Sequence, residues 1–169
     1  MLEGGGVFEF ELVFDEHLAR QAAEYRLSDF VFDGSMEGDF DTAYPVFADF
    51  AKGLAAAGVL SRAPHLHLTH PLIVKSPELR PNLAATQVAI GKQLNLGVSG
   101  VMLVTVETAE EARAGIAAMR FASSGGVRAA DVGQAPAVWG MTEAEYRQRA
   151  DVWPLNPNGE LINWTIVES

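Results

Sequence analysis

An acidic residue that could bind a metal ion stands where a predicted strand ends. The run LINWTIV at 161–167 is continuously apolar in character and predicts a buried strand, and Glu168 follows it directly. In parallel α/β folds the active site lies at the carboxyl ends of the strands. A carboxylate there suits Mg²⁺ or Mn²⁺, which prefer oxygen ligands. Glu168 is therefore a candidate metal ligand, and the alternative is a solvated side chain at the chain terminus.

Three histidines fall in the stretch HLHLTH at 65–70. In a strand, alternation places His65 and His67 on one face and His70 on the other. An H-x-H pair of this kind begins the metal site of some hydrolases, so a hydrolase that uses His65 and His67 is one possibility. Ordinary side chains on a strand near a sheet edge are the favoured interpretation.

Two basic residues could anchor an anionic ligand. Arg128 lies in the glycine-rich stretch SSGGVRAADVG, and a glycine-rich backbone with one arginine suits a carboxylate or a phosphate. The spacing matches neither a P-loop nor the dinucleotide-binding fingerprint, and a flexible loop is the alternative. Lys75 follows the predicted strand at 65–74, where it is either an anion anchor or a surface charge.

Strand and helix patterns alternate along the chain, and such alternation predicts a parallel sheet covered by helices. A T-x-E-E pattern makes Thr108 the N-cap of one helix, and Thr142 fits the N-cap of another. A doubly wound sheet and a (β/α)8 barrel both fit this alternation, although a whole barrel typically needs about 250 residues. The predicted strands are 7–14, 29–34, 65–74, 98–106 and 161–167; the predicted helices are 15–27, 40–58, 81–97, 108–122 and 141–153, with an irregular stretch at 122–140.

Composition narrows the classes of function. The 169 residues suit one domain, and 49% hydrophobic content with 20% charged residues suits an ordinary globular core. A net charge of −10 argues against nucleic-acid and anionic-membrane partners, which need clustered lysine and arginine. There is no cysteine, no apolar run long enough to span a membrane and no signal-peptide pattern, so a cytoplasmic location is expected.

Three stretches together resemble the HpcH/HpaI aldolase/citrate lyase family. GVSGVMLVTVETAEEARAGIAAMRF at 97–121 is similar to the family's central strand and helix. SDFVFDGSMEGDFD at 28–41 is similar to the stretch where the family carries D-F-V-x-x-D-x-E-H-G-P. The segment at 137–169 is similar to the tail of one subgroup, and its part ADVWPLNPNGEL is the most specific match.

The resemblance implies a (β/α)8 barrel, often assembled as a trimer or hexamer, and a divalent-metal-dependent aldolase acting on 2-oxo acids such as pyruvate. It matches Glu168 to the first metal-binding carboxylate and Glu37 to the position of the family's basic histidine. The second metal carboxylate of the family falls in a segment beyond residue 169. His70 and Lys75 are the nearest basic residues to the family's substrate-binding arginine, and Arg128 is retained from its arginine-rich segment.

The sequence therefore predicts a single α/β domain over 1–169, forming part of an aldolase-type TIM barrel. The expected activity is metal-dependent cleavage or formation of a carbon–carbon bond on a 2-oxo acid, with an aldehyde as the second reactant and Mg²⁺ or Mn²⁺ as the cofactor. The expected site has Glu37 and His70 as catalytic residues, Lys75 and Arg128 as substrate-binding residues and Glu168 as the metal ligand. A homo-oligomer is expected. The alternative is a non-catalytic barrel relative that serves as a binding or assembly subunit.

Overall fold

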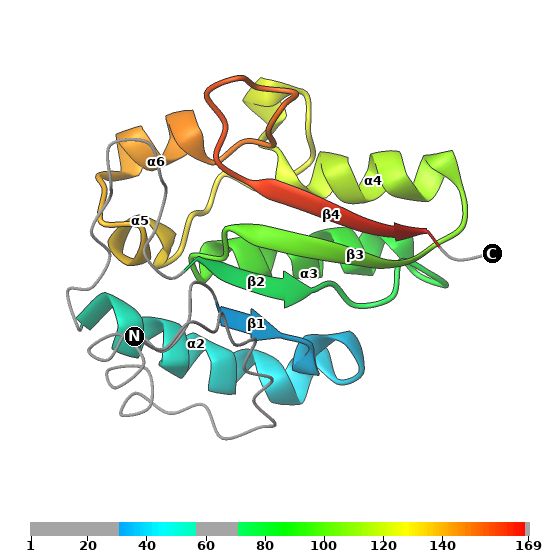
Figure 1. Cartoon of the computed structure of the whole chain (residues 1–169), viewed down its shortest axis with the longest axis horizontal. Coiled ribbons are helices and arrows are strands. Elements are labelled where there is room, and N and C mark those ends of the chain that lie inside the picture. Colours follow the sequence, from blue (N-terminus) through cyan, green and yellow to red (C-terminus); the bar gives the residue numbers. More distant parts are fainter. Residues whose placement is uncertain (1–30, 57–70, 168–169) are drawn as a thin grey trace, which may run out of the picture.

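The computed structural model describes residues 31–56 and 71–167. These contain one sheet of four parallel strands in the order β1-β2-β3-β4 (Figure 1). The predicted strand at 7–14, the predicted helix at 15–27, the three histidines of 65–70 and Glu168 lie outside the described residues. The strands are β1 Val31–Asp33, β2 Leu72–Lys75, β3 Gly100–Val106 and β4 Ile162–Val167.

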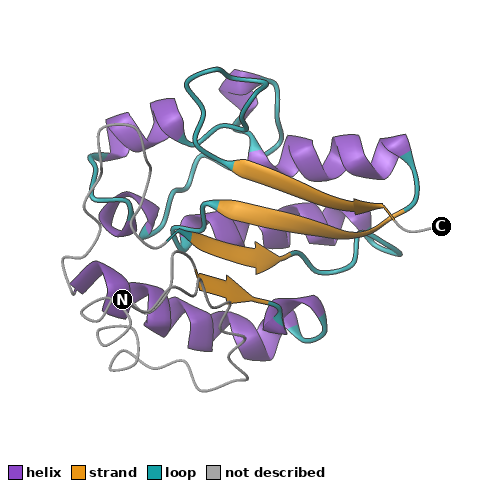
Figure 2. Cartoon of the chain, in the orientation of Figure 1, coloured by secondary structure: helices purple, strands orange, loops and turns teal. Residues whose placement is uncertain are grey.

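Helices connect the strands, as the alternation predicts (Figure 2). The stretch at 122–140, predicted to be irregular, contains two short helices; the irregular prediction missed them because each spans only a single turn. The helices are η1 Ser35–Glu37, α2 Phe40–Ala56, α3 Leu83–Asn95, α4 Ala109–Met119, η2 Ala122–Ser124, α5 Ala135–Val138 and α6 Glu143–Arg149.

The order of the strands decides between the two architectures that the sequence leaves open. Each described strand pairs with its predecessor in the chain, and the order never reverses. A doubly wound sheet reverses its strand order at a switch point, whereas a barrel adds each strand beside the last. The predicted α/β class, with a parallel sheet of the TIM-barrel type, is therefore confirmed.

Side-chain caps fix where the helices begin. The Thr108 hydroxyl accepts from the Glu111 N–H, and the Glu111 carboxylate accepts from the Thr108 N–H, which forms the predicted capping box of α4. Thr142 and Glu145 form the same reciprocal pair at the start of α6. Each pair satisfies N–H groups that have no partner within the helix, so both helices begin at defined residues.

One face of the sheet is covered by helices and forms the core. Leu72, Val74, Val101 and Leu103 are fully buried on this face. Helix α4 packs closely there, because a Cβ added at Gly115 would lie 2.5 Å from Leu103 Cδ1. In Figure 1, α3 lies behind the strands and α4 runs alongside β4. Burying each of these aliphatic side chains stabilises the fold by roughly 1.5–3 kcal/mol.

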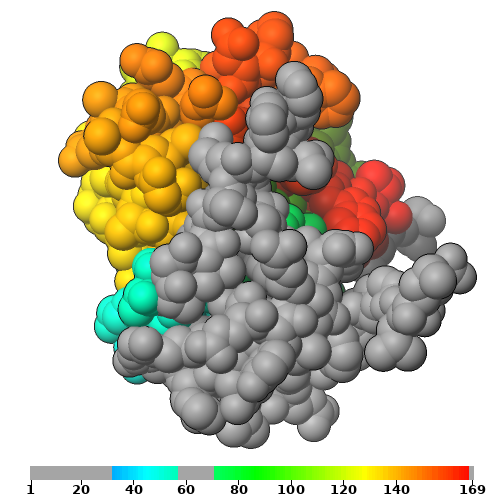
Figure 3. All heavy atoms as spheres, turned by 60° about the vertical axis from the view of Figure 1, so that its left-hand side comes forward, coloured from blue at the N-terminus to red at the C-terminus, as the bar shows by residue number. Residues whose placement is uncertain are grey.

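The opposite face becomes increasingly exposed toward β4. Strand pairing places Met102 beside Trp164 and Gly100 beside Ile162 on this face. Met102 is 7% exposed, whereas Ile162 is 48% and Trp164 52% exposed, and Figure 3 shows red atoms of the last strand at the molecular surface. The prediction that LINWTIV is a buried core strand is therefore wrong. Among the described strands β4 pairs only with β3, so it lies at an edge of the described sheet.

None of the helices in the described part of the chain is long and apolar enough to cross a membrane.

Candidate functional site

Two of the predicted site residues meet at the carboxyl ends of β1 and β2. Lys75 is the last residue of β2, and Glu37 ends the 3-10 turn that follows β1. The Lys75 ammonium donates to Glu37 Oε2 at 2.7 Å, and the two side chains are 29% and 32% exposed. The pair joins residues 38 positions apart at the end of the sheet where parallel α/β folds place their active sites.

A buried acid lies beside this pair. Asp33 ends β1, and its two carboxylate oxygens accept from the N–H and the hydroxyl of Ser35 at 3.2 and 2.9 Å. Burial raises the pKa of Asp33 above its ordinary value, and the hydrogen bonds from Ser35 oppose that rise. Asp33 therefore holds the turn that leads to Glu37.

No sequence pattern points to a fourth residue at this end of the sheet, Gln93 on α3. It is fully buried, and its amide donates to the Lys75 carbonyl at 2.7 Å and approaches Met36 Sδ at 3.7 Å. One side chain thus holds the end of β2 and the turn beside Glu37. A glutamine in a helix carries no pattern that points to a distant carbonyl, so only the tertiary structure reveals this role.

The carboxyl end of β3 carries a separate group of charges. Arg80 forms ion pairs with Glu107 and Glu111, the latter at 3.1 Å. The backbone N–H groups of Glu107 and Thr108, together with Arg80, hold the pKa of Glu111 below its ordinary value. These acids are therefore already occupied by Arg80 and by the helix cap.

The backbone departs from regular geometry at the same end of β3. Thr105 has a φ of +54°, and the pairing of β3 with β4 shifts register between Leu103 and Val106. A positive φ at a β-branched residue is an outlier that the surrounding structure must hold in place. Its hydroxyl donates to the Val104 carbonyl at 2.8 Å. The irregularity lies at the carboxyl edge, where bulges commonly adjust the direction of side chains.

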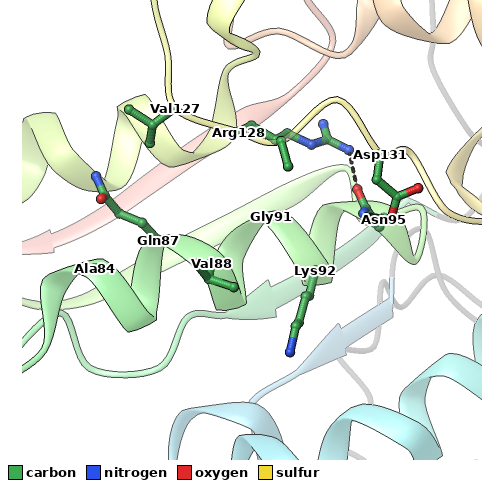
Figure 4. Close-up of a pocket in the computed structure, with 10 residues that line it drawn as sticks. Ala84, Gln87, Val88, Gly91, Lys92, Asn95, Val127, Arg128 and Asp131 are labelled. Carbon is green, nitrogen blue, oxygen red and sulfur yellow. Dashed lines mark hydrogen bonds between the residues drawn. The ribbon is translucent and has the colours of Figure 1, made fainter.

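Arg128 does not lie with Glu37 and Lys75. Its guanidinium donates to Asn95 Oδ1 and to the Tyr146 hydroxyl, both at 3.0 Å, and lies 4.4 Å from the centroid of the Phe121 ring. Asn95 ends α3 just before β3 begins, so this arginine lies at the opposite end of the sheet. Figure 4 shows its guanidinium directed toward Asn95, beside a pocket that borders α3. At 4% exposure, Arg128 acts in the core as a cation packed on aromatic rings.

The motif ADVWPLNPNGEL forms a turn that is held together by hydrogen bonds to Asp151. Asp151 accepts from Arg120 Nε at 2.6 Å and from Arg120 Nη2 at 3.1 Å, and also from the Val152 N–H and the Asn156 amide. Gly159 closes the turn, because a Cβ there would lie 2.4 Å from the Asp151 carbonyl oxygen. The most specific part of the sequence resemblance therefore builds a turn before β4.

The described residues do not by themselves fit a divalent metal. In residues 31–56 and 71–167 no group of three or more histidine, aspartate and glutamate side chains could hold an ion. Glu37 is paired with Lys75, and Glu107 and Glu111 are paired with Arg80. A metal site would need Glu168, which is next in sequence after the last residue of β4, together with ligands beyond those described.

Comparison with known proteins supports the fold. A crystal structure of an HpcH/HpaI aldolase/citrate lyase family protein from Burkholderia cenocepacia J2315 aligns with 90% of this chain, at a TM-score of 0.58 and 20% sequence identity. The two chains share a fold. The predicted resemblance to this aldolase family is thus confirmed at the level of the fold. The alignment covers 51% of the other chain, so this chain spans about half the length of the structure it matches. No family model matches the sequence, and no curated protein matches it.

Proposed function

We propose that this chain forms part of a divalent-metal-dependent aldolase that cleaves or forms a carbon–carbon bond on a 2-oxo acid. The observation that carries the proposal is the Lys75–Glu37 pair at the carboxyl ends of a singly wound parallel sheet. That position is where barrel enzymes bind their substrates, and the sheet shares its fold with an aldolase family protein.

The reaction assigns a role to each member of the pair. In the cleavage direction a base removes the proton from the hydroxyl group that becomes the aldehyde oxygen. The carbon–carbon bond breaks, and its electron pair leaves with the 2-oxo acid as an enolate, which takes up a proton to give the free acid. Glu37 is the proposed base, and Lys75 is the proposed partner of the substrate carboxylate.

Two further residues enter the proposal from the sequence alone. Glu168 is the proposed metal ligand, and a bound Mg²⁺ or Mn²⁺ would supply Lewis-acid stabilisation of the enolate. His70 is a second proposed acid–base residue. Arg128 is left out of the proposed site, because its contacts support a structural role at the other end of the sheet.

Exchange of the methyl protons of pyruvate tests the proposal. The full chain is incubated with pyruvate in D₂O with and without Mg²⁺ or Mn²⁺, and deuterium incorporation is followed by NMR. Metal-dependent exchange that is lost in Glu168→Gln and reduced in Glu37→Gln supports an aldolase. Exchange no faster than in buffer with the same metal contradicts it.

A non-catalytic binding or assembly subunit is the second candidate. It is favoured by one observation: the acids at the carboxyl ends of β1 and β3 that the structure describes are engaged by Lys75, Ser35 and Arg80. An acid held in this way is the arrangement of a structural ion pair. Thermal unfolding with and without Mn²⁺ separates the candidates, since an enzyme that binds the ion should unfold at a higher temperature in its presence.

A further inference from the structure

The contact between Lys75 and Glu37 resembles the contact that an ammonium group makes with a bound carboxylic acid. A protonated amine faces a carboxylate at 2.7 Å, which is the distance of a charge-assisted hydrogen bond. Both side chains remain about one-third exposed, so solvent and small solutes can reach them. A small carboxylic acid from solution carries the same functional group that Glu37 presents to the ammonium.

The surroundings leave Lys75 one carboxylate partner among the described acids. Asp33 is next along the sheet edge, but both of its oxygens accept from Ser35. The lysine stem passes Gly34, where an added Cβ would be in ordinary van der Waals contact with Lys75 Cδ, at 3.5 Å. Among the described acids, the ammonium therefore has Glu37 as its counter-charge.

Gln93 on α3 contacts the chain segments that carry both members of the pair. Gln93 is fully buried, donates to the Lys75 carbonyl and contacts the sulfur of Met36, the residue before Glu37. Met36 is itself fully buried. These contacts hold the backbone that carries Lys75 and Glu37, so the Glu37 side chain can turn away from Lys75 without a change in that backbone.

We propose that the Glu37 carboxylate occupies the position of the substrate carboxylate on Lys75 and is displaced when a 2-oxo acid binds. This inference rests on the proposed function. It adds that the Glu37 carboxylate competes with the substrate carboxylate for Lys75. Binding exchanges one carboxylate for another at the same ammonium, so Lys75 keeps a counter-charge before and after and the Glu37 carboxylate is the group set free. The exchange also frees Glu37 from its ion pair only when substrate is present, which is when a base is needed.

Binding of pyruvate to charge variants of the full chain tests this inference. Isothermal titration with pyruvate and with acetate is carried out on the wild type, Glu37→Gln and Lys75→Met. Removing the competitor is expected to lower the pyruvate Kd roughly two- to fivefold, the range expected of a solvent-accessible ion pair. Removing the ammonium is expected to raise it about tenfold or more.

A matched variant controls for net charge. Asp49→Asn removes one negative charge from the exposed Asp49–Lys52 pair, as Glu37→Gln does at the site, and is expected to leave both affinities unchanged. An affinity in Glu37→Gln equal to or weaker than that of the wild type overturns the inference, as does a Lys75→Met variant that binds pyruvate as well as the wild type. If either binding result overturns the inference and the wild type still exchanges the methyl protons of pyruvate, the aldolase proposal stands although the competition at Lys75 is refuted. Tighter binding of both acids in Glu37→Gln, with no exchange activity in the wild type, refutes the aldolase and retains the competition at Lys75.

Discussion

The two faces of the sheet differ in how far their side chains are buried. On the helix-covered face, Leu72, Val74, Val101 and Leu103 are fully buried, and α4 approaches so closely that Gly115 cannot carry a side chain without displacing Leu103. On the opposite face, Ile162 and Trp164 are about half exposed, and Lys75 meets Glu37 at the carboxyl edge.

The difference in burial separates side chains that stabilise the fold from side chains that a ligand could reach. The four aliphatic side chains named on the covered face are fully buried and offer no polar group to a ligand. At the carboxyl edge, the Lys75 and Glu37 side chains remain about one-third exposed, so water reaches both of them. Substitutions on the covered face should therefore change the free energy of unfolding, whereas those at the Lys75–Glu37 pair should change ligand binding.

The largest effect is expected from Leu103→Ala. It removes a fully buried side chain and leaves a cavity against α4, which should lower the free energy of unfolding by about 3–5 kcal/mol. Trp164→Ala on the opposite face removes a larger side chain that is half exposed, and should cost about 1 kcal/mol or less. Urea unfolding measures both, and equal losses would show that the two faces are equally packed.

Asp151→Ala should rank second, at about 3 kcal/mol, because it leaves Arg120 without its bidentate partner in a mostly buried site. Asp49→Ala is the control, since it breaks an exposed pair and should cost less than about 0.5 kcal/mol. Urea unfolding again gives the comparison. A small loss in Asp151→Ala would mean that the turn before β4 holds without this carboxylate.

Acid should remove part of the same stabilisation. Burial raises the pKa of Asp151, but hydrogen bonds from Arg120, the Val152 N–H and Asn156 together bring it below its ordinary value. A depressed pKa in the folded state contributes stability above the unfolded value of about 4, and that contribution is lost as pH falls through the lower, folded pKa. Unfolding followed between about pH 5 and pH 2 should be less pH-dependent in Asp151→Asn. An unchanged slope in this variant would place the acid sensitivity elsewhere.

A smaller effect is expected at the helix that covers β3. Thr108→Ala removes the acceptor for the Glu111 N–H and should cost about 1 kcal/mol. Thr108→Ser keeps the hydroxyl and serves as the control, with most of the stability retained. Thermal unfolding distinguishes the two variants, and equal melting temperatures would show that the cap contributes little.

The smallest effect on stability is expected from Glu37→Gln. The pair is about one-third exposed, so its loss should change the free energy of unfolding by about 0.5 kcal/mol or less. The same variant is expected to change pyruvate affinity, which separates a binding role from a structural one. A loss of several kcal/mol on urea unfolding would assign the pair to the fold instead.

Much of the architecture could be predicted from the sequence because it depends on local patterns. The T-x-E-E pattern placed the start of α4 at Thr108, and alternating strand and helix patterns indicated a parallel sheet. The same patterns could not give the strand order or the exposure of β4. An apolar strand has the same sequence whether neighbours cover both sides or one, so LINWTIV was wrongly predicted to be buried.

The candidate site, too, was predicted from the sequence only in part. The rule for parallel strands pointed to Lys75 at the end of a predicted strand, and the family resemblance pointed to Glu37. That their side chains form one ion pair, that Gln93 fixes the backbone beneath them and that Arg128 lies at the other end of the sheet came only from the tertiary structure. Each of these contacts joins residues at least 18 positions apart in the chain, and sequence patterns specify contacts only over a turn or two.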